Sequence, residues 1–123
     1  MKLVDSCGWL QFFSDGPLSA QYGKELSAKS EEILVPSIVL YEVFKFLLRT
    51  SGEETAIRCT AHMTQCQMVE LDATLALESA ETSIATNLAM ADAIVYATAR
   101  KHKAPLITSD ADLKGLEGVV FLG

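Results

Sequence analysis

Short apolar segments that alternate with longer amphipathic segments restrict the fold of this chain more than any other feature. Five apolar segments have the length of buried strands, at 2–5, 33–35, 68–71, 105–108 and 119–121. The segments between them have helical spacing, at 6–13, 18–29, 38–50, 53–65, about 73–85 and 91–103. Strands that alternate with helices are typical of a parallel sheet covered on both faces. We therefore predict an α/β fold, a three-layer α/β/α sandwich with a mainly parallel central sheet.

The boundaries of these segments carry turn and cap residues. Pro36 is expected to end the second strand, and Ser37 is a favoured N-cap for the helix that follows. Gly52 stands where that helix should end. The chain contains no internal repeat, low-complexity tract or linker, and its 123 residues suit one domain. We predict a single domain over 1–123.

Charge and composition exclude several classes of protein. Ten Lys and Arg stand against sixteen Asp and Glu, which gives a net charge of −6, and half of the residues are hydrophobic. This composition excludes a disordered chain, and the acidic balance argues against the simplest nucleic-acid binders because it repels phosphate. No apolar segment approaches the roughly 18–20 residues of a membrane span. Three cysteines without a CxxC pair are typical of reduced thiols, so we expect a cytoplasmic protein without a secretory signal.

Five carboxylates stand near the ends of the predicted strands or in the helices beside them. Asp5 ends the first strand, and Asp110 and Asp112 follow the fourth. Glu42 lies in the second turn of the helix after the second strand, and Asp92 in the first turn of the helix before the fourth strand. In an open parallel sheet, ligands bind beyond the carboxyl ends of the strands. Carboxylates that converge there would repel one another, so they imply a bound Mg²⁺ or Mn²⁺.

Each of these acids also has an ordinary structural explanation. Asp5 is a favoured residue for capping the helix that follows it, and Asp92 would complement the dipole of its helix. Asp110 and Asp112 are common turn residues. The carboxylates therefore point to a metal site only when they are taken together.

Glu42 belongs to a narrow polar stripe on an otherwise apolar helix. Glu42, Lys45 and Arg49 are spaced i, i+3 and i+7, so they share one face of that helix. The stripe is either a solvated strip with a Glu–Lys pair or the wall of a cleft. In a cleft, Glu42 would bind metal and the two cations would contact the substrate.

The order and spacing of these motifs resemble those of the PIN-domain nucleases, and in size and layout those of VapC-type toxins from toxin–antitoxin pairs. The resemblance covers essentially the whole chain. It rests on the apolar start that ends at Asp5-Ser6, on Pro36-Ser37 leading to Glu42, on Ala91-Asp92-Ala93 and on Leu106-Ile107-Thr108-Ser109-Asp110.

The resemblance implies a metal-dependent endoribonuclease that hydrolyses single-stranded RNA and leaves a 5′-phosphate. The residues that would hold one or two Mg²⁺ or Mn²⁺ ions are Asp5, Glu42, Asp92 and Asp110. It also implies a homodimer and a small antitoxin partner. The usual motif continues to an acid followed by Phe, whereas here Asp112 precedes Leu113. Whether Asp110 alone or Asp112 as well serves the metal therefore stays open.

In this interpretation the acids have different roles. Asp5 is central and anchors the first metal, because it ends a buried strand. Asp92 and Glu42 complete that set of ligands, and Asp110 is the outermost acid. The hydroxyl groups that would orient these carboxylates belong to Ser6, Thr108 and Ser109.

Three other interpretations remain open. A phosphorylation-receiver domain has a similar length and fold, and Asp72 after the third strand would be its phosphate acceptor. A PIN-like protein could also act only through interactions, without catalysis. Finally, Cys59, His62 and Cys66 share one helix face and are zinc ligands by type, but one helix supplies only part of a tetrahedral set.

The apolar surface of the helices is larger than one small core needs. These apolar surfaces lie on the amphipathic helix predicted over 18–29 and on the largely apolar helix predicted over 38–50. This excess favours a dimer.

Overall fold

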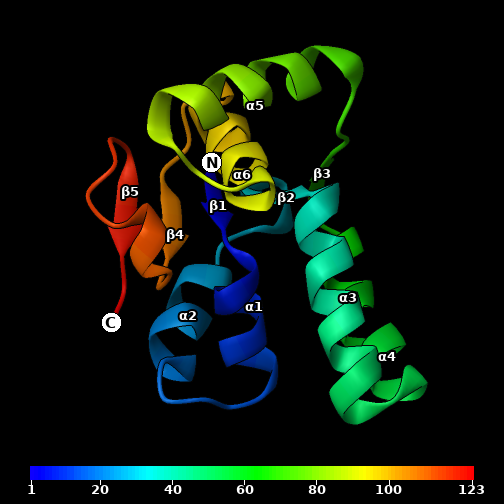
Figure 1. The fold of residues 1–123 in the computed structure, drawn as a ribbon. Coiled ribbons are helices and arrows are strands. Elements are labelled where there is room, and N and C mark those ends of the chain that lie inside the picture. Colours follow the sequence, from blue (N-terminus) through cyan, green and yellow to red (C-terminus); the bar gives the residue numbers. More distant parts are fainter.

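Five short parallel strands form the centre of the computed structural model, which describes residues 1–123 (Figure 1). They are β1 (Lys2–Val4), β2 (Ile33–Pro36), β3 (Gln67–Val69), β4 (Leu106–Thr108) and β5 (Val119–Phe121). Their order across the sheet is β3-β2-β1-β4-β5, and every neighbouring pair is parallel. The predicted α/β architecture with a parallel sheet is confirmed.

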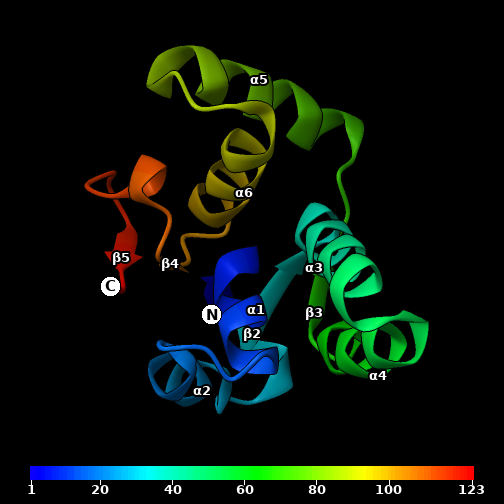
Figure 2. The same ribbon diagram turned by 60° about the horizontal axis from the view of Figure 1, so that its bottom comes forward.

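Six helices and two short 3₁₀ turns connect the strands. The helices are α1 (Ser6–Phe13), α2 (Ser19–Leu26), α3 (Ser37–Ser51), α4 (Glu53–Thr64), α5 (Ala73–Thr86) and α6 (Met90–Lys101). The 3₁₀ turns are η1 (Ser30–Glu32) and η2 (Ala111–Leu113). Figure 2 shows α5 and α6 on one side of the sheet, and α2 and α4 on the other. No helix combines the length and the apolar character needed to cross a membrane.

The direction of the connections reverses between β1 and β4. The chain moves from β1 to β2 to β3 in one direction, and then α5 and α6 carry it back past both strands to β4. Right-handed crossovers in opposite directions place their helices on opposite faces of the sheet. The reversal leaves β1 and β4 side by side at the topological switch point, where open α/β sheets bind their ligands.

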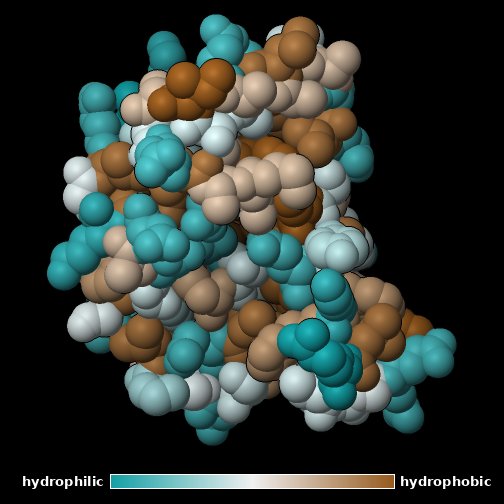
Figure 3. All heavy atoms as spheres, viewed as in Figure 1, coloured by the Kyte–Doolittle hydropathy of each residue, from teal (hydrophilic) through white to brown (hydrophobic).

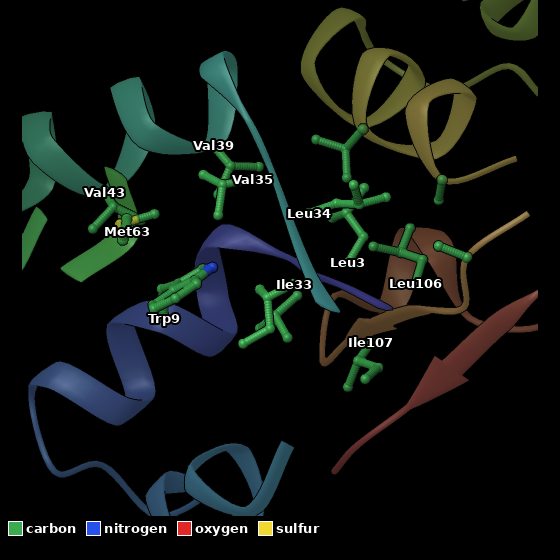
Figure 4. Close-up of a cluster of buried hydrophobic side chains, with 14 of the residues drawn as sticks. Leu3, Trp9, Ile33, Leu34, Val35, Val39, Val43, Met63, Leu106 and Ile107 are labelled. Atoms are coloured by element: carbon green, nitrogen blue, oxygen red, sulfur yellow. The ribbon is translucent and has the colours of Figure 1, made fainter. Parts of the chain in front are cut away.

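The core lies on both faces of the strands. Leu3 of β1 pairs with Leu34 of β2 and with Leu106 of β4. These three side chains point towards α6, whereas Ile33 and Ile107 point to the opposite face (Figure 4). All five are buried. Because both faces are covered, the strands are continuous apolar runs rather than alternating ones.

Several predicted boundaries are wrong; for example, the helix predicted over 18–29 is α2, which ends at Leu26. The residue that precedes α3 as its N-cap is Pro36, which has no side-chain cap hydrogen bond, so Ser37 is the first helical residue rather than the cap. Pro36 is also the last residue of β2 and pairs with Val69. Proline has no backbone N–H to donate to a neighbouring strand, but this donor is not needed at the end of a strand. The strand can therefore run through Pro36 directly into the helix. Similarly, α6 ends at Lys101 because Lys103 adopts a left-handed φ of 53°.

Candidate active site

Asp5 is fixed by hydrogen bonds to both of its carboxylate oxygens. It follows β1 directly and caps α1, so its Oδ1 accepts a hydrogen bond of 2.8 Å from the Ser6 amide. Its Oδ2 accepts a hydrogen bond of 2.8 Å from the hydroxyl of Thr108, the last residue of β4. The residue is only 4% exposed. The capping role expected of Asp5 therefore exists, and it holds the carboxylate in place at the switch point.

Asp110 is positioned by the turn that leaves β4. Its amide donates to the Thr108 hydroxyl over 3.0 Å. Its Oδ1 in turn accepts a hydrogen bond of 2.9 Å from the Asp112 amide and so caps η2. The turn role expected of Asp110 is therefore present as well. Because β1 and β4 are parallel neighbours, this turn lies at the same sheet edge as Asp5.

Asp92 completes a cluster of three carboxylates. It lies in the first turn of α6 and is half-buried. One carboxylate oxygen from each of Asp5, Asp92 and Asp110 lies within 4.8 Å of the other two. We call these three residues the acid cluster. It joins groups from the two ends of the sequence and from a helix between them.

Glu42 lies beside the acid cluster but outside the group of three. It is half-buried on the second turn of α3. Burial raises the pKa of its carboxyl, and the charge of Asp5 raises this pKa further. The structure therefore places Glu42 within electrostatic reach of Asp5 and outside the 4.8 Å set.

Burial and mutual repulsion disfavour the ionised form of these acids. Burial raises the pKa of Asp5, although the hydrogen bond from Thr108 partly opposes this effect. Burial, followed by the charges of Asp110 and Asp5, raises the pKa of Asp92 to about 6. A cation at the cluster would relieve both effects.

No basic side chain neutralises the acid cluster. The ion pairs of the chain are Lys2–Glu25, Arg100–Glu117 and Lys101–Glu78, and none of them includes a predicted site acid. The Glu42–Lys45 pair considered from the sequence is absent from this set. Hard carboxylate oxygens without a cationic partner fit a divalent ion such as Mg²⁺ or Mn²⁺. Asp5, Asp92 and Asp110 could hold such an ion.

Asp112 and Asp92 both line a hollow of about 300 Å³, together with residues 86–89. Asp112 itself is exposed, and its charge contributes to the raised pKa of Asp92. The structure brings Asp110 into the acid cluster and leaves Asp112 at its rim.

A model of the PIN domain family matches residues 2–119. The chain belongs to the PIN domain family. The match covers nearly all of the chain, as the sequence resemblance did. No curated protein matched the chain in a sequence search.

Solved structures similar to this PIN domain include toxins. A toxin–antitoxin complex from Klebsiella pneumoniae has a TM-score of 0.82 and 25% identity, over 98% of this chain and 96% of that chain. VapC20 of Mycobacterium tuberculosis, a toxin that cleaves the sarcin-ricin loop, has a TM-score of 0.73 and 19% identity over 85% of each chain. VapBC2 of Rickettsia felis, bound to a DNA fragment from its promoter, has a TM-score of 0.75 and 16% identity, over 98% of this chain and 96% of that chain.

The remaining predicted site residues of the PIN domain lie around the acid cluster in different ways. A hydrogen bond from the Ser6 side chain opposes the rise in the pKa of Glu42. The Ser109 hydroxyl is turned towards Cys7. Lys45 is exposed, and its Nζ lies 5.7 Å from the centre of the Tyr41 ring. Arg49 is exposed in the last turn of α3.

Two residues beside the acid cluster escaped the sequence interpretation. Tyr22 is fully buried, and its hydroxyl donates to Ser109 Oγ over 3.0 Å. The Cys7 sulfur lies 3.5 Å from Thr108 Oγ1 and 3.4 Å from Ser109 Oγ. Leu18, Tyr22 and Leu26 are spaced by four residues, and this pattern predicts only an apolar helix face for Tyr22. The position of Cys7, two residues after Asp5 at the start of a helix, was the signal available.

The structure gives no support to the receiver or the zinc interpretation. Asp72 follows β3, an edge strand, and caps α5 by accepting a hydrogen bond of 2.8 Å from the Leu75 amide. It lies outside the acid cluster. Cys59 and Cys66 pack against the hydrophobic core and, with His62, line a largely apolar pocket of about 500 Å³. These three residues do not form a group that could hold a metal ion.

Proposed function

We propose that this PIN domain is a metal-dependent endoribonuclease that cleaves single-stranded RNA, and that it is the toxin of a toxin–antitoxin pair. The observation that carries the proposal is the convergence of Asp5, Asp92 and Asp110 within 4.8 Å without a basic partner. Family membership supports nuclease chemistry at this cluster. VapC20, a toxin of the same fold that cleaves the sarcin-ricin loop, supports RNA as the substrate.

The acid cluster would hold one or two Mg²⁺ or Mn²⁺ ions. When bound, such ions supply an activated water and stabilise the charge that develops on the phosphate. Asp5 contributes a carboxylate that two hydrogen bonds already orient. Asp92 and Asp110 each bring a carboxylate oxygen within 4.8 Å of it, and Glu42 would add a fourth carboxylate from α3. We propose that hydrolysis leaves the phosphate on the 5′ end.

RNA would approach the acid cluster along α3. Lys45 and Arg49 are exposed on this helix at three and seven residues beyond Glu42, so they follow the same helix face away from the acids. Their charges would attract the RNA backbone towards a site that otherwise repels it. No histidine is needed as a general base in this scheme.

A small antitoxin and a second copy of the chain are the proposed protein partners. The toxin–antitoxin complexes of similar fold support the antitoxin. Large apolar side chains exposed on α3 and α5 support a homodimer; they are Tyr41, Phe46, Leu48, Leu77 and Ile84. Figure 3 shows apolar side chains along α5 on the outer surface. The three free cysteines fit the reducing cytoplasm.

The test is cleavage of a labelled single-stranded RNA by the purified chain with Mg²⁺ or Mn²⁺. Wild type should cleave, a chelator should stop cleavage, and Asp92→Asn should lose at least 100-fold in rate. Asp72→Asn is the matched control. Like Asp92, Asp72 is an aspartate at the start of a helix, but it lies outside the acid cluster. It should cleave like wild type.

Two results would overturn the proposal. Cleavage that persists in chelator or in Asp92→Asn would remove the acid cluster from the reaction. A folded wild type that binds metal and RNA without cleaving would instead favour the PIN-like protein that acts only through interactions.

A further inference from the structure

The sulfur of Cys7 is the centre of a polar network behind the acid cluster. It accepts hydrogen bonds from the Ser109 amide over 3.5 Å and from the Ser109 hydroxyl over 3.4 Å. Its own S–H lies 3.9 Å from Asp5 Oδ2, the oxygen that also accepts from Thr108. Cys7 therefore connects the start of α1 to the turn after β4.

Tyr22 completes the network from α2. Its hydroxyl donates to Ser109 Oγ over 3.0 Å, and the Ser109 hydroxyl in turn donates a hydrogen bond to the Cys7 sulfur. The donors run in one direction, from Tyr22 through Ser109 to Cys7. Each hydroxyl group thus has a defined partner, and the side chain of Ser109 is held from two sides.

Gly8 shows how tightly the Tyr22 ring is seated. A Cβ added to Gly8 would lie 2.6 Å from Cδ1 of Tyr22 and 2.6 Å from Cγ1 of Val4. Only a residue without a side chain lets the ring approach the first turn of α1 in this way. The ring, α1 and β1 therefore form one packed unit to which Ser109 is attached.

Ser109 stands in the chain between Thr108 and Asp110, the two residues through which β4 reaches the acid cluster. Thr108 before it binds Asp5, and Asp110 after it belongs to the cluster. Side chains on both sides of the turn then limit the movement of Asp110 relative to Asp5. The contacts of Ser109 add to the hydrogen bond between the Asp110 amide and the Thr108 hydroxyl, which ties the start of the turn to β4.

We propose that Tyr22, Ser109 and Cys7 are positioning residues that set the distance between Asp5 and Asp110, and thereby the affinity of the acid cluster for a divalent ion. This inference rests on the proposed metal-dependent function. The three residues touch no substrate; they act through the two acids. Groups that orient metal ligands typically change metal affinity by roughly 10- to 100-fold when they are removed.

Tyr22→Phe tests the proposal because it removes the hydroxyl and keeps the ring. The matched control is Tyr96→Phe, since Tyr96 is also buried and its hydroxyl donates to the Glu117 carbonyl over 2.7 Å, not to a residue of the acid cluster or of the Cys7 network. The probe is Mn²⁺, titrated into the chain and followed by the electron paramagnetic resonance signal of the free ion. Thermal unfolding of the metal-free chains measures the structural cost of each substitution.

We expect Tyr22→Phe and Ser109→Ala to weaken Mn²⁺ binding by about tenfold, at the lower end for such groups. Tyr96→Phe should lower the unfolding temperature without changing the affinity. Cys7→Ala should weaken binding, and Cys7→Ser should restore part of it because a hydroxyl oxygen can still accept from Ser109.

An unchanged Mn²⁺ affinity in both Tyr22→Phe and Ser109→Ala would overturn the proposal. So would an equal loss in Tyr96→Phe, because the effect would then follow stability alone. Wild type that binds no Mn²⁺ would overturn this inference together with the proposed function. Wild type that binds Mn²⁺ and leaves RNA intact would overturn only the proposed function, and the affinities of the variants would still decide this inference.

Discussion

The hydroxyl of Thr108 joins two carboxylate residues: it donates to Asp5 Oδ2 over 2.8 Å and accepts from the amide of Asp110 over 3.0 Å. Thr108 is fully buried, so water cannot replace either hydrogen bond. The last residue of β4 thus fixes the side chain that ends β1 and the backbone of the turn that follows. One hydroxyl group thus connects the ends of two strands that are far apart in the sequence.

Replacing Thr108 with Val should therefore damage both stability and metal binding. Val keeps the shape and removes the hydroxyl, which leaves the buried Asp5 carboxylate without one donor. We expect a loss of about 1–3 kcal/mol in the free energy of unfolding and roughly 10- to 100-fold weaker Mn²⁺ binding. Urea unfolding and calorimetric titration measure these two quantities.

Thr98→Val is the control for this substitution. Thr98 is also fully buried, and its hydroxyl donates to the Ile94 carbonyl within α6. It should lower stability without changing metal affinity, and Thr108→Ser should recover much of the affinity. Equal metal affinity in Thr108→Val and wild type would contradict the role of this hydroxyl.

Divalent ions should stabilise the folded chain. The unfolded chain cannot gather carboxylates from positions 5, 92 and 110, so binding is coupled to folding. At a free Mn²⁺ concentration of about 100 times Kd, the free energy of unfolding should rise by about 2.7 kcal/mol. Scanning calorimetry with and without chelator measures this gain. A comparable gain in Asp92→Asn would place the ion elsewhere.

The metal-free chain should become more stable when the pH falls from 7.5 towards 5. The pKa of Asp92 is raised from an ordinary 3.8 to about 6, and burial raises those of Asp5 and Glu42 as well. Between the unfolded and folded values, the folded chain binds more protons, so its stability falls as the pH rises. The contribution of Asp92 to stability is complete below its ordinary pKa of 3.8 and is lost as the pH rises through about 6.

Urea unfolding of wild type and Asp92→Asn at the two pH values isolates this contribution. Asn removes a carboxylate that repels its neighbours, so the variant should be more stable than wild type at pH 7.5 by roughly 0.5–1 kcal/mol, a value discounted for solvent screening. Its own pH dependence should be smaller. The same pH dependence in both chains would refute this assignment.

Asp110 and Asp112 should differ in importance. Asp110 belongs to the acid cluster, whereas Asp112 is exposed and contributes its backbone amide to Asp110. Removing a group that only orients a metal ligand typically costs roughly 10- to 100-fold. We expect Asp110→Asn to lower the cleavage rate by at least about 100-fold and Asp112→Asn to lower it by less than about tenfold. Single-turnover cleavage of a labelled RNA compares them. A larger loss in Asp112→Asn would reverse the assignment.

Charges on the outer face of α5 should separate the proposed homodimer. Leu77 is 69% exposed and Ile84 is 88% exposed, so their replacement by Glu costs little in the monomer. We expect Leu77→Glu combined with Ile84→Glu to convert dimers to monomers in sedimentation velocity. Ile57→Glu on α4, where the side chain is 53% exposed, is the control. A wild type that sediments as a monomer would remove the proposal.

The order of strands and helices followed from the sequence because burial on both faces leaves a strong pattern. Every predicted strand is present, and the sheet edge that collects the acids followed from the rule for open parallel sheets. The exact ends of strands and helices are harder to predict where one residue serves two elements. Pro36 ends β2 and precedes α3, and β3 begins one residue before its predicted start because edge strands carry a weak pattern.

Contacts between side chains far apart in the chain could not be predicted. The Tyr22–Ser109 and Cys7–Ser109 hydrogen bonds join residues 87 and 102 positions apart. Such contacts depend on how α1 and α2 pack against β4, and no local pattern encodes that packing. The sequence could mark Tyr22 as buried, but the partner of its hydroxyl emerges only from the folded chain.

The acidic balance has a different meaning once the site is known. Asp5, Glu42, Asp92 and Asp110 supply four of the six excess negative charges of the chain. These charges are concentrated at one edge of the sheet instead of being spread over the surface. The rest of the chain is close to neutral. Salt should therefore weaken RNA binding steeply only if Lys45 and Arg49 bind the RNA phosphates.

The adjacency of β1 and β4 also determines when the acid cluster comes into being. The Thr108 hydroxyl that orients Asp5 is added by the ribosome 103 residues after Asp5 itself. A chain that stops before Thr108 contains Asp5 and Asp92 but lacks both the hydroxyl that orients Asp5 and the third acid, Asp110. Translation must pass Asp110 before the cluster can exist, so the order of the strands alone keeps the proposed RNA-cutting centre from forming on any shorter nascent chain.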